Sequence, residues 1–307
     1  MEPWLYAVIC TPVCITAIIC NILFFFCLMR PVTGVTLRYP LRLLFIVLLC
    51  NSTFQQLVIA VTIVIAYVPP PFWLQTITRA LIYATFCGNF SCNAWISIFY
   101  YMSIVPQHLP ILVCIKKNIR VVLYAGFTLN QVILLFSVSM GAITFLLTET
   151  PMINSTINKL NTTTAATVKE KEHFLFLVSN ALYLLYCTCP MVTLSISWGK
   201  TFVYLRGHMK AMGQSCESFS QPQRKSQIRV TVTGMVQAAL FLPSTIWTVA
   251  VALLYISNLF ETVDPSRYIT MAFSSVSGLG NVLCFGFSQS VFRKGIASLF
   301  KKSKADS

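Results

Sequence analysis

The chain has 307 residues, of which 56% are hydrophobic, 13% aromatic and only 10% charged. An average soluble domain is about one quarter charged, and so few charges would leave large apolar patches on a soluble surface. The composition therefore excludes a soluble enzyme and a disordered chain. The net charge of +14 does not indicate a nucleic-acid partner, because the basic residues lie between long apolar runs. An integral membrane protein remains.

Seven apolar runs are long enough to cross a bilayer, since a transmembrane helix needs about 20 mostly apolar residues. In chain order, the expected spans are residues 4–29, 41–68, 80–105, 121–147, 174–204, 230–257 and 268–291. They predict an all-α, seven-transmembrane helix bundle with the whole chain, 1–307, as one multi-pass domain of the plasma membrane. The first run starts beside Glu2 with no basic residue before it, which favours a retained span over a cleaved signal peptide.

The charges between the spans predict the orientation. Counted alternately from the N-terminus, 17 Lys and Arg residues lie on one side of the bundle and 5 on the other. Most Asp and Glu residues lie on the poorly basic side. The positive-inside rule then places the N-terminus and the loop 148–173 outside the cell, and the tail 292–307 in the cytosol.

The long extracellular loop carries two glycosylation sequons. They begin at Asn154 and Asn161, in a polar stretch rich in Thr. Oligosaccharide is added only in an accessible segment on the lumenal side. We therefore expect a glycoprotein modified at these two asparagines.

The spans contain no Lys, Arg, Asp or Glu in their middle. Intramembrane charge marks proton relays, ion paths and retinal sites, so the sequence argues against a pump, a metalloenzyme and a retinal protein. Ten of the 12 Cys lie within the expected spans, including Cys87 toward the outer end of span three, and they behave as small apolar residues. We expect no catalytic residue, no metal, no cofactor and no disulfide.

Several local patterns resemble the bitter taste receptors, the type 2 taste receptor family of G-protein-coupled receptors. Ser97–Tyr101 resembles the Ser-Ile/Val-Phe-Tyr stretch at the end of their third span, and Asn21 matches a single Asn of their first span. Leu205–Met212 is similar to their Leu-x-x-His-x-x-x-Met exit from span five, and Arg229–Gly234 opens span six. The order and spacing of these motifs cover nearly the whole chain. The family also lacks the disulfide of most rhodopsin-like receptors, and here Cys87 has no Cys partner in the loop 148–173.

Three segments depart from the family pattern. Span three ends in Met102–Pro106, span seven carries Leu279–Asn281 instead of a His-Ser pair, and span two has Asn51–Thr53 where an Arg is expected. These departures are typical of a divergent member, such as one from a non-mammalian vertebrate. A vomeronasal type 1-like pheromone receptor is the main alternative, and a seven-span transporter or channel is a further one.

The resemblance implies a ligand pocket that opens outward between the spans. Such a pocket is mostly apolar with a few polar anchors, and without an acid in it neutral bitter agonists fit better than cations. In span three Gly88, Ser91, Cys92, Trp95 and Phe99 form one helical face. The candidate ligand contacts are Gln55, Gln56, Ser91, Cys92, Trp95, Phe99, Asn180, Tyr183, Leu184, Trp247, Val251, Ile269 and Ala272.

The resemblance also implies that the cytosolic side engages a heterotrimeric G protein of the gustducin-like or inhibitory class. Basic residues there can attract acidic lipid or an acidic protein surface. The candidates are Lys116, Lys117, Arg120, Arg206, His208, Lys210 and Arg229. In the tail, Phe292, Ile296, Leu299 and Phe300 recur at helical spacing with Lys and Arg between them. This pattern predicts a short amphipathic C-terminal helix that contacts membrane lipids.

Overall fold

The computed structural model describes residues 2–30, 37, 39–68, 71–107, 109–149, 162–212, 221–256 and 267–305. Within these residues the chain forms helices and no strand. The nine helices are α1 (Pro3–Met29), α2 (Tyr39–Ile65), α3 (Phe72–Ile104), α4 (Pro110–Lys117), α5 (Ile119–Glu149), α7 (Thr162–Met212), α8 (Gln221–Ile256), α10 (Tyr268–Ser288) and α11 (Ser290–Ala305).

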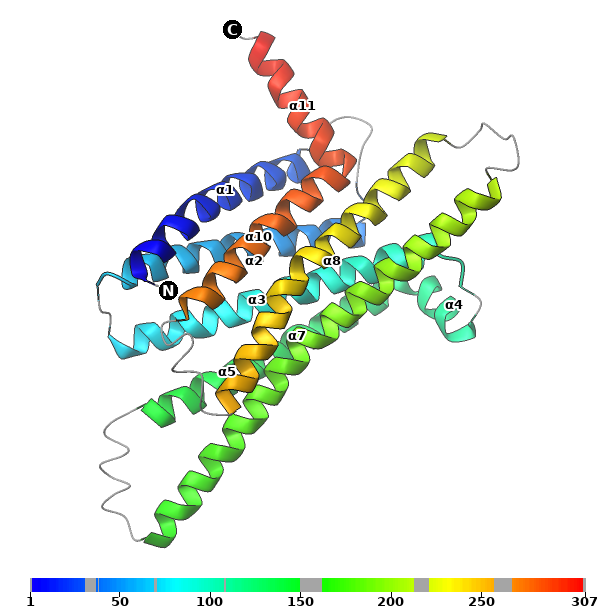
Figure 1. Ribbon diagram of the computed structural model, residues 1–307. Coiled ribbons are helices and arrows are strands. Elements are labelled where there is room, and N and C mark those ends of the chain that lie inside the picture. Colours follow the sequence, from blue (N-terminus) through cyan, green and yellow to red (C-terminus); the bar gives the residue numbers. More distant parts are fainter. Residues whose placement is uncertain are drawn as a thin grey trace.

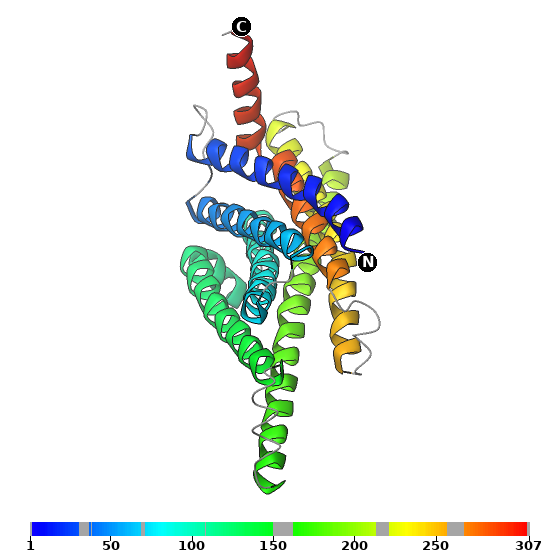
Figure 2. The ribbon, with the colours of Figure 1, turned by 90° about the vertical axis from the view of Figure 1, so that its left-hand side faces the viewer.

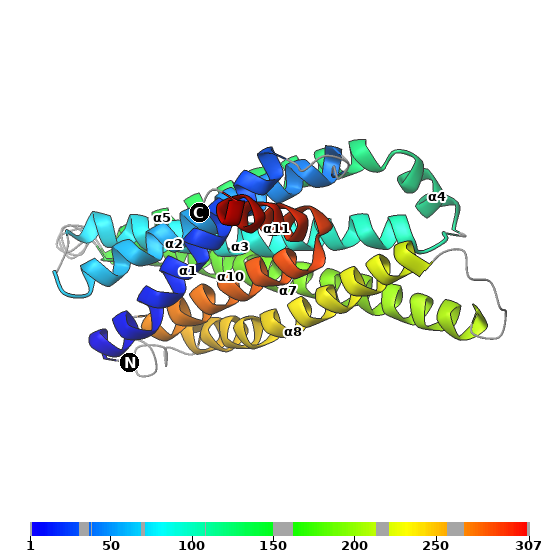
Figure 3. The same cartoon turned by 90° about the horizontal axis from the view of Figure 1, so that it is seen from above.

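Seven long helices form a closed bundle, with consecutive helices running in opposite directions (Figure 1). Each of α1, α2, α3, α5, α7, α8 and α10 contacts the next, and α10 contacts α1. Seen from above, they lie lengthwise beside one another, with the short α4 at one end (Figure 3). Helix α3 occupies a central position because it contacts α2, α5, α7 and α10. The predicted seven-helix bundle is therefore confirmed.

Five segments of the described chain are long and apolar enough to cross a membrane. They are Pro3–Met29, Tyr39–Ile65, Ile119–Met140, Gln227–Val251 and Tyr268–Ser288. Helix α3 is less apolar because its inner position surrounds it with protein, and it buries polar residues such as Asn89 and Asn93. On the outer helices, large apolar side chains such as Val8 and Ile22 are exposed, as expected for a lipid-facing surface.

Several helices extend beyond the expected spans. Helix α7 covers Thr162–Met212 and so includes residues 162–173, which the sequence assigns to an extracellular loop. Helix α3 begins at Phe72, and α4 is not expected from the sequence. Hydropathy detects the part of a helix that suits lipid, whereas backbone hydrogen bonds continue the helix into polar segments.

The last expected span, 268–291, is interrupted near its end. Helix α10 ends at Ser288, Gln289 has extended backbone angles, and α11 starts at Ser290. Helix α11 then extends away from the bundle (Figures 1 and 2). Its Phe292 is fully buried, with its ring centroid 4.8 Å from that of Phe24 and 6.0 Å from that of Phe45. The amphipathic C-terminal helix is therefore anchored to α1 and α2 through its first turn.

Three clusters of buried side chains make up the core. One cluster joins α1, α2, α3, α5, α10 and α11 around Phe45, Phe99 and Phe285. A second joins α3, α5, α7 and α8 around Phe90 and Trp198. The third lies where α1, α2, α3 and α10 meet at Tyr6. Packing is thus distributed along the bundle.

Candidate functional site

A chain of hydrogen-bonded amides joins α2, α3 and α10 inside the bundle. Asn51 Nδ2 donates to Asn89 Oδ1 (2.8 Å), and Asn89 Nδ2 donates to Gln55 Oε1 (2.6 Å). Gln55 Nε2 then donates to Ser274 Oγ of α10 (2.5 Å). These side chains are buried apart from the half-buried Asn51. Because unpaired amides in such surroundings are costly, the bonds hold the three helices in one register.

Gln56 makes a second contact between α2 and α10. Its Oε1 accepts from Ser275 Oγ at 2.8 Å, and its Nε2 donates to the Ser275 carbonyl oxygen at 3.3 Å. Gly278 lies one turn further along α10, where a Cβ atom would come within 2.6 Å of Gln56 Nε2. The glycine therefore gives the fully buried Gln56 side chain the space to reach the α10 backbone.

A third polar contact continues the network toward the expected cytosolic half. Gln237 Nε2 of α8 donates to Asn93 Oδ1 of α3 (2.6 Å) and also to Asn281 Oδ1 of α10. Asn281 Nδ2 is buried without a hydrogen-bond partner. Nearer the end of the bundle, Gln289 Nε2 donates to Tyr100 OH (2.9 Å). Polar contacts thus recur from the middle of the bundle to the α10–α11 junction.

The expected ligand-facing row of α3 is turned toward α2 and α5. Ser91 Oγ accepts from Asn130 Nδ2 of α5 at 2.5 Å, and the Trp95 ring lies against Gly126 of α5. Cys92 and Phe99 are buried in the cluster around Phe45. All four side chains have protein partners here, and their role as ligand contacts stays a prediction.

The other candidates lie on α7, α8 and α10. Trp247 Nε1 donates to Thr270 Oγ1 at 3.0 Å, and its ring stacks on Phe273 with centroids 5.7 Å apart. Val251 is buried, whereas Leu184, Ile269 and Ala272 are half-buried. The side chains of Asn180, Tyr183 and Lys210 and the whole of Asn154 and Asn161 lie outside the described part of the structure. Trp247 is therefore the candidate on α8 with a defined partner on α10.

Two contacts near the expected extracellular ends of the helices are not predicted from the sequence. Arg267 Nη1 donates to Tyr83 OH (2.5 Å), and the guanidinium carbon lies 5.5 Å from the Tyr83 ring centroid. Tyr6 OH is 2.7 Å from Thr62 Oγ1, and its ring stacks on Tyr268 at 4.7 Å. The signal in the sequence was Arg267, a cation just before an apolar run, but its aromatic partner lies 184 residues away.

The expected G-protein-facing residues are distributed over four helices. Those with described side chains are all exposed: Lys116, Lys117, Arg120, Arg206, His208 and Arg229. The imidazole ring of His208 stacks on Tyr204 at 6.0 Å. The first two end α4 and Arg120 begins α5, so the exposed charges follow the end of the bundle that the positive-inside rule assigns to the cytosol.

In the part of the chain that the structure describes, no group of three or more His, Cys, Asp or Glu side chains could hold a metal ion. The described cysteines, Cys87 among them, are free thiols. Among the described residues, the interior offers hydrogen bonding by amides and hydroxyls and stacking of aromatic rings.

These features define a rhodopsin-like seven-transmembrane helical bundle of a multi-pass membrane protein. The crystal structure of squid rhodopsin matches with a TM-score of 0.62 over 99% of this chain and 87% of that chain, at 14% sequence identity. No family model matches the chain, and no curated protein matches it in sequence. The likeness shows the fold, and α10 carries no Lys to which retinal could be attached.

Proposed function

We propose that the chain is a G-protein-coupled chemosensory receptor of the bitter taste type. Small molecules bind in an extracellular-facing pocket between the helices, and binding activates a heterotrimeric G protein at the cytosolic side. The observation that carries the proposal is the polar network of Gln55, Asn89, Asn93, Gln237 and Asn281 in a rhodopsin-like bundle. It joins the helices of the expected pocket to α8 and the cytosolic half of α10.

A receptor of this kind acts by a change of population and performs no covalent chemistry. An agonist that binds one helix arrangement better than another shifts the equilibrium toward it. In this proposal, activation changes which of the neighbouring Asn, Gln and Ser side chains the amides of the network pair with. Asn281 Nδ2, which has no partner, is a donor available for such an exchange. Pro243, inside α8, favours bending of that helix.

The pocket suits neutral agonists. Trp247 and Phe273 offer stacking surfaces, and Gln55 and Gln56 offer amides that could hydrogen-bond a polar group. None of the candidate ligand contacts is an acid that would select a cation. The agonists in this proposal are therefore apolar or weakly polar bitter compounds, which bind mainly through burial of their apolar surface.

The exposed basic residues from Lys116 to Arg229 form the surface for the G protein, of gustducin-like or inhibitory class, and for acidic lipids. Plasma-membrane location and glycosylation at Asn154 and Asn161 belong to the same proposal. Both asparagines would then lie on the cell exterior.

A calcium assay tests the proposed function. Cells express the chain with a promiscuous or gustducin-like G protein and receive a panel of diverse bitter compounds. We expect saturable responses that mock-transfected cells lack, and a weaker response from Trp247→Ala than from Phe287→Ala, whose side chain faces outward with 68% exposure. Silence despite confirmed surface expression would reject the bitter receptor in favour of the vomeronasal-like alternative, to be screened with pheromone-type ligands.

A further inference from the structure

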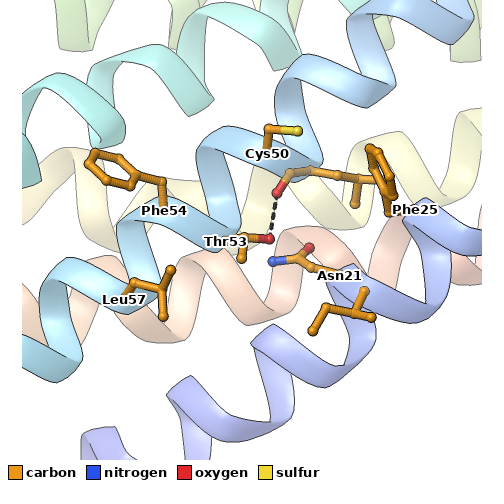
Figure 4. A pocket seen from close by; sticks show the side chains of 8 residues that line it. Asn21, Phe25, Cys50, Thr53, Phe54 and Leu57 are labelled. Atoms are coloured by element: carbon orange, nitrogen blue, oxygen red, sulfur yellow. Dashed lines mark hydrogen bonds between the residues drawn. The ribbon is translucent and has the colours of Figure 1, made fainter.

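A pocket of about 350 Å³ lies on the outer side of the bundle between α1 and α2, away from the proposed agonist pocket. Its lining consists of Asn21, Ile22, Phe25, Leu49, Cys50, Thr53, Phe54 and Leu57. Figure 4 shows the aromatic rings of Phe25 and Phe54 at opposite sides, with the Asn21 amide between the two helices. The lining is therefore apolar except for a few polar atoms near Asn21 and Thr53.

The pocket opens to the lipid. Ile22, Phe54 and Leu57 are 59%, 45% and 49% exposed, and both helices are long and apolar enough to cross a membrane. Asn21 lies eight residues before the end of α1 at Met29, or about 12 Å along the helix axis. This depth is within the hydrocarbon region, so an occupant enters from the bilayer.

Asn21 gives the pocket an unused hydrogen-bond acceptor. Its side chain is 1% exposed, and its Nδ2 donates to Ser52 Oγ at 3.2 Å. Its Oδ1 is buried without a partner. The nearby Thr53 hydroxyl cannot supply a proton while it donates to the Leu49 carbonyl oxygen at 2.7 Å. Leaving a buried acceptor without a hydrogen bond is unfavourable, so a ligand hydroxyl that donates to Oδ1 removes part of this penalty.

We propose that the α1–α2 pocket binds a neutral, membrane-dissolved molecule that carries one hydroxyl on a compact apolar body, such as a phenol or a terpene alcohol. The hydroxyl donates to Asn21 Oδ1 after a small rotation of the amide, and the apolar body lies between Phe25 and Phe54. Because the lining contains no charged side chain, an ionised headgroup would lose its hydration without compensation. Binding at this site stabilises the observed packing of α1 against α2, and it does not require that the agonist pocket is occupied.

Photolabelling tests the site on the full chain in lipid nanodiscs. Azioctanol, an aliphatic alcohol with a photoreactive diazirine, is bound and irradiated, and mass spectrometry maps the labelled residues. We expect labels on Ile22, Phe54 or Leu57, and displacement by thymol at about three- to tenfold lower membrane concentration than by p-cymene. The two competitors share one skeleton, and only thymol has a hydroxyl, which contributes one neutral hydrogen bond. Equal displacement by the two competitors would overturn the proposal.

Variants distinguish binding in the pocket from non-specific labelling by probe dissolved in the bilayer. Asn21→Leu should remove the advantage of thymol over p-cymene, whereas Ser52→Ala, which leaves Oδ1 in place, should keep it. Leu57→Trp fills the pocket from its exposed side and should abolish the labelling, with little risk to folding. Ile196 on α7, 52% exposed and outside the pocket, serves as the internal control. The site would be rejected if thymol displaced the label at Ile196 as well as it displaces the label in the pocket. It would also be rejected if labelling of the pocket residues survived Leu57→Trp.

Discussion

The indole ring of Trp198 in α7 lies directly against Gly234 in α8, so closely that a Cβ atom on Gly234 would overlap it. Trp198 is buried, and its ring centroid lies 5.7 Å from that of Tyr100 in α3. Tyr100 in turn accepts a hydrogen bond from Gln289 at the α10–α11 junction. The Gly234 position therefore sets how closely α7 and α8 approach in the half of the bundle assigned to the cytosol.

Gly234→Ala should lower stability by about 1–3 kcal/mol, because overpacking a rigid ring forces side chains or backbone to shift. The melting temperature of the purified chain in detergent measures this effect. Gly199→Ala is the matched control, since Gly199 lies one residue from Trp198 and has no atom within 4 Å of an added Cβ. An unchanged melting temperature for Gly234→Ala would contradict the contact.

Gln237→Leu should be destabilising by about 1–3 kcal/mol, because it leaves Asn93 Oδ1 and Asn281 Oδ1 buried without their donor. In the proposed receptor the same change alters the basal signal, since α3, α8 and α10 lose their common bridge. Thermal melting and basal calcium signalling are the two measurements. Val236→Ala, on the exposed face of the same helix, should change neither, and equal behaviour of the two variants would reject the bridging role.

The sequence predicts the bundle well because lipid imposes a simple requirement: seven apolar runs of sufficient length. It predicts helix ends less well. Residues 162–173 look like a polar loop by hydropathy but continue α7, because a helix outside the lipid needs no apolar side chains. The break at Gln289 is also missed. Ser288, Gln289 and Ser290 are polar, but Ser and Asn also occur within α10 itself, so this polar triplet does not by itself mark a helix end.

Of the polar network, the sequence points to Gln55 and Gln56, which were predicted as candidate ligand contacts. Gln55 and Gln56 stand out because amides deep in lipid need partners, and the structure supplies those partners on α3 and α10. Gln237 and Asn93 were missed because pairing between residues 144 positions apart depends on how the helices are rotated. Ser91 and Trp95 both contact α5, through Asn130 and Gly126, and a contact between two helices cannot be read from the spacing within one of them.

Two changes at Tyr83 should separate its contacts with Arg267. Tyr83→Phe removes the hydroxyl that accepts from Arg267 Nη1 and keeps the ring beneath the guanidinium. We expect a loss of about 0.5–1.5 kcal/mol. Tyr83→Leu removes both contacts and should cost a further 0.5–1 kcal/mol, roughly the value of an exposed cation–π interaction. Melting curves of both variants test whether Tyr83→Leu is less stable than Tyr83→Phe. Equal losses of stability would show that the Tyr83 ring contributes nothing beyond its hydroxyl.

Gly126→Ala should be harmful only while Trp95 is present, because the added methyl would overlap the indole ring. We expect a loss of about 1–3 kcal/mol in the parent chain. The same change should be close to neutral in a Trp95→Leu background. A double-mutant cycle on melting temperature measures this coupling, and additive losses would contradict the contact. Trp95→Leu alone, tested in the calcium assay at matched surface expression, then reports whether the ring also contacts agonist.

Phe292 should be the residue that holds α11 to the bundle. Its ring is fully buried against Phe24 and Phe45, so Phe292→Ala leaves a cavity and should cost about 3–5 kcal/mol. Phe287→Ala, five residues earlier and largely exposed, should cost much less. Thermal melting gives the stability difference, and proteolysis at the basic residues of α11 shows whether the helix has separated. Rapid cleavage of α11 in Phe292→Ala, while the rest of the bundle stays intact, would indicate that the ring holds α11 in place and is not needed for the bundle itself. Slow cleavage at the parent rate would place the anchor elsewhere, at the close contact of Gly295 with Cys27.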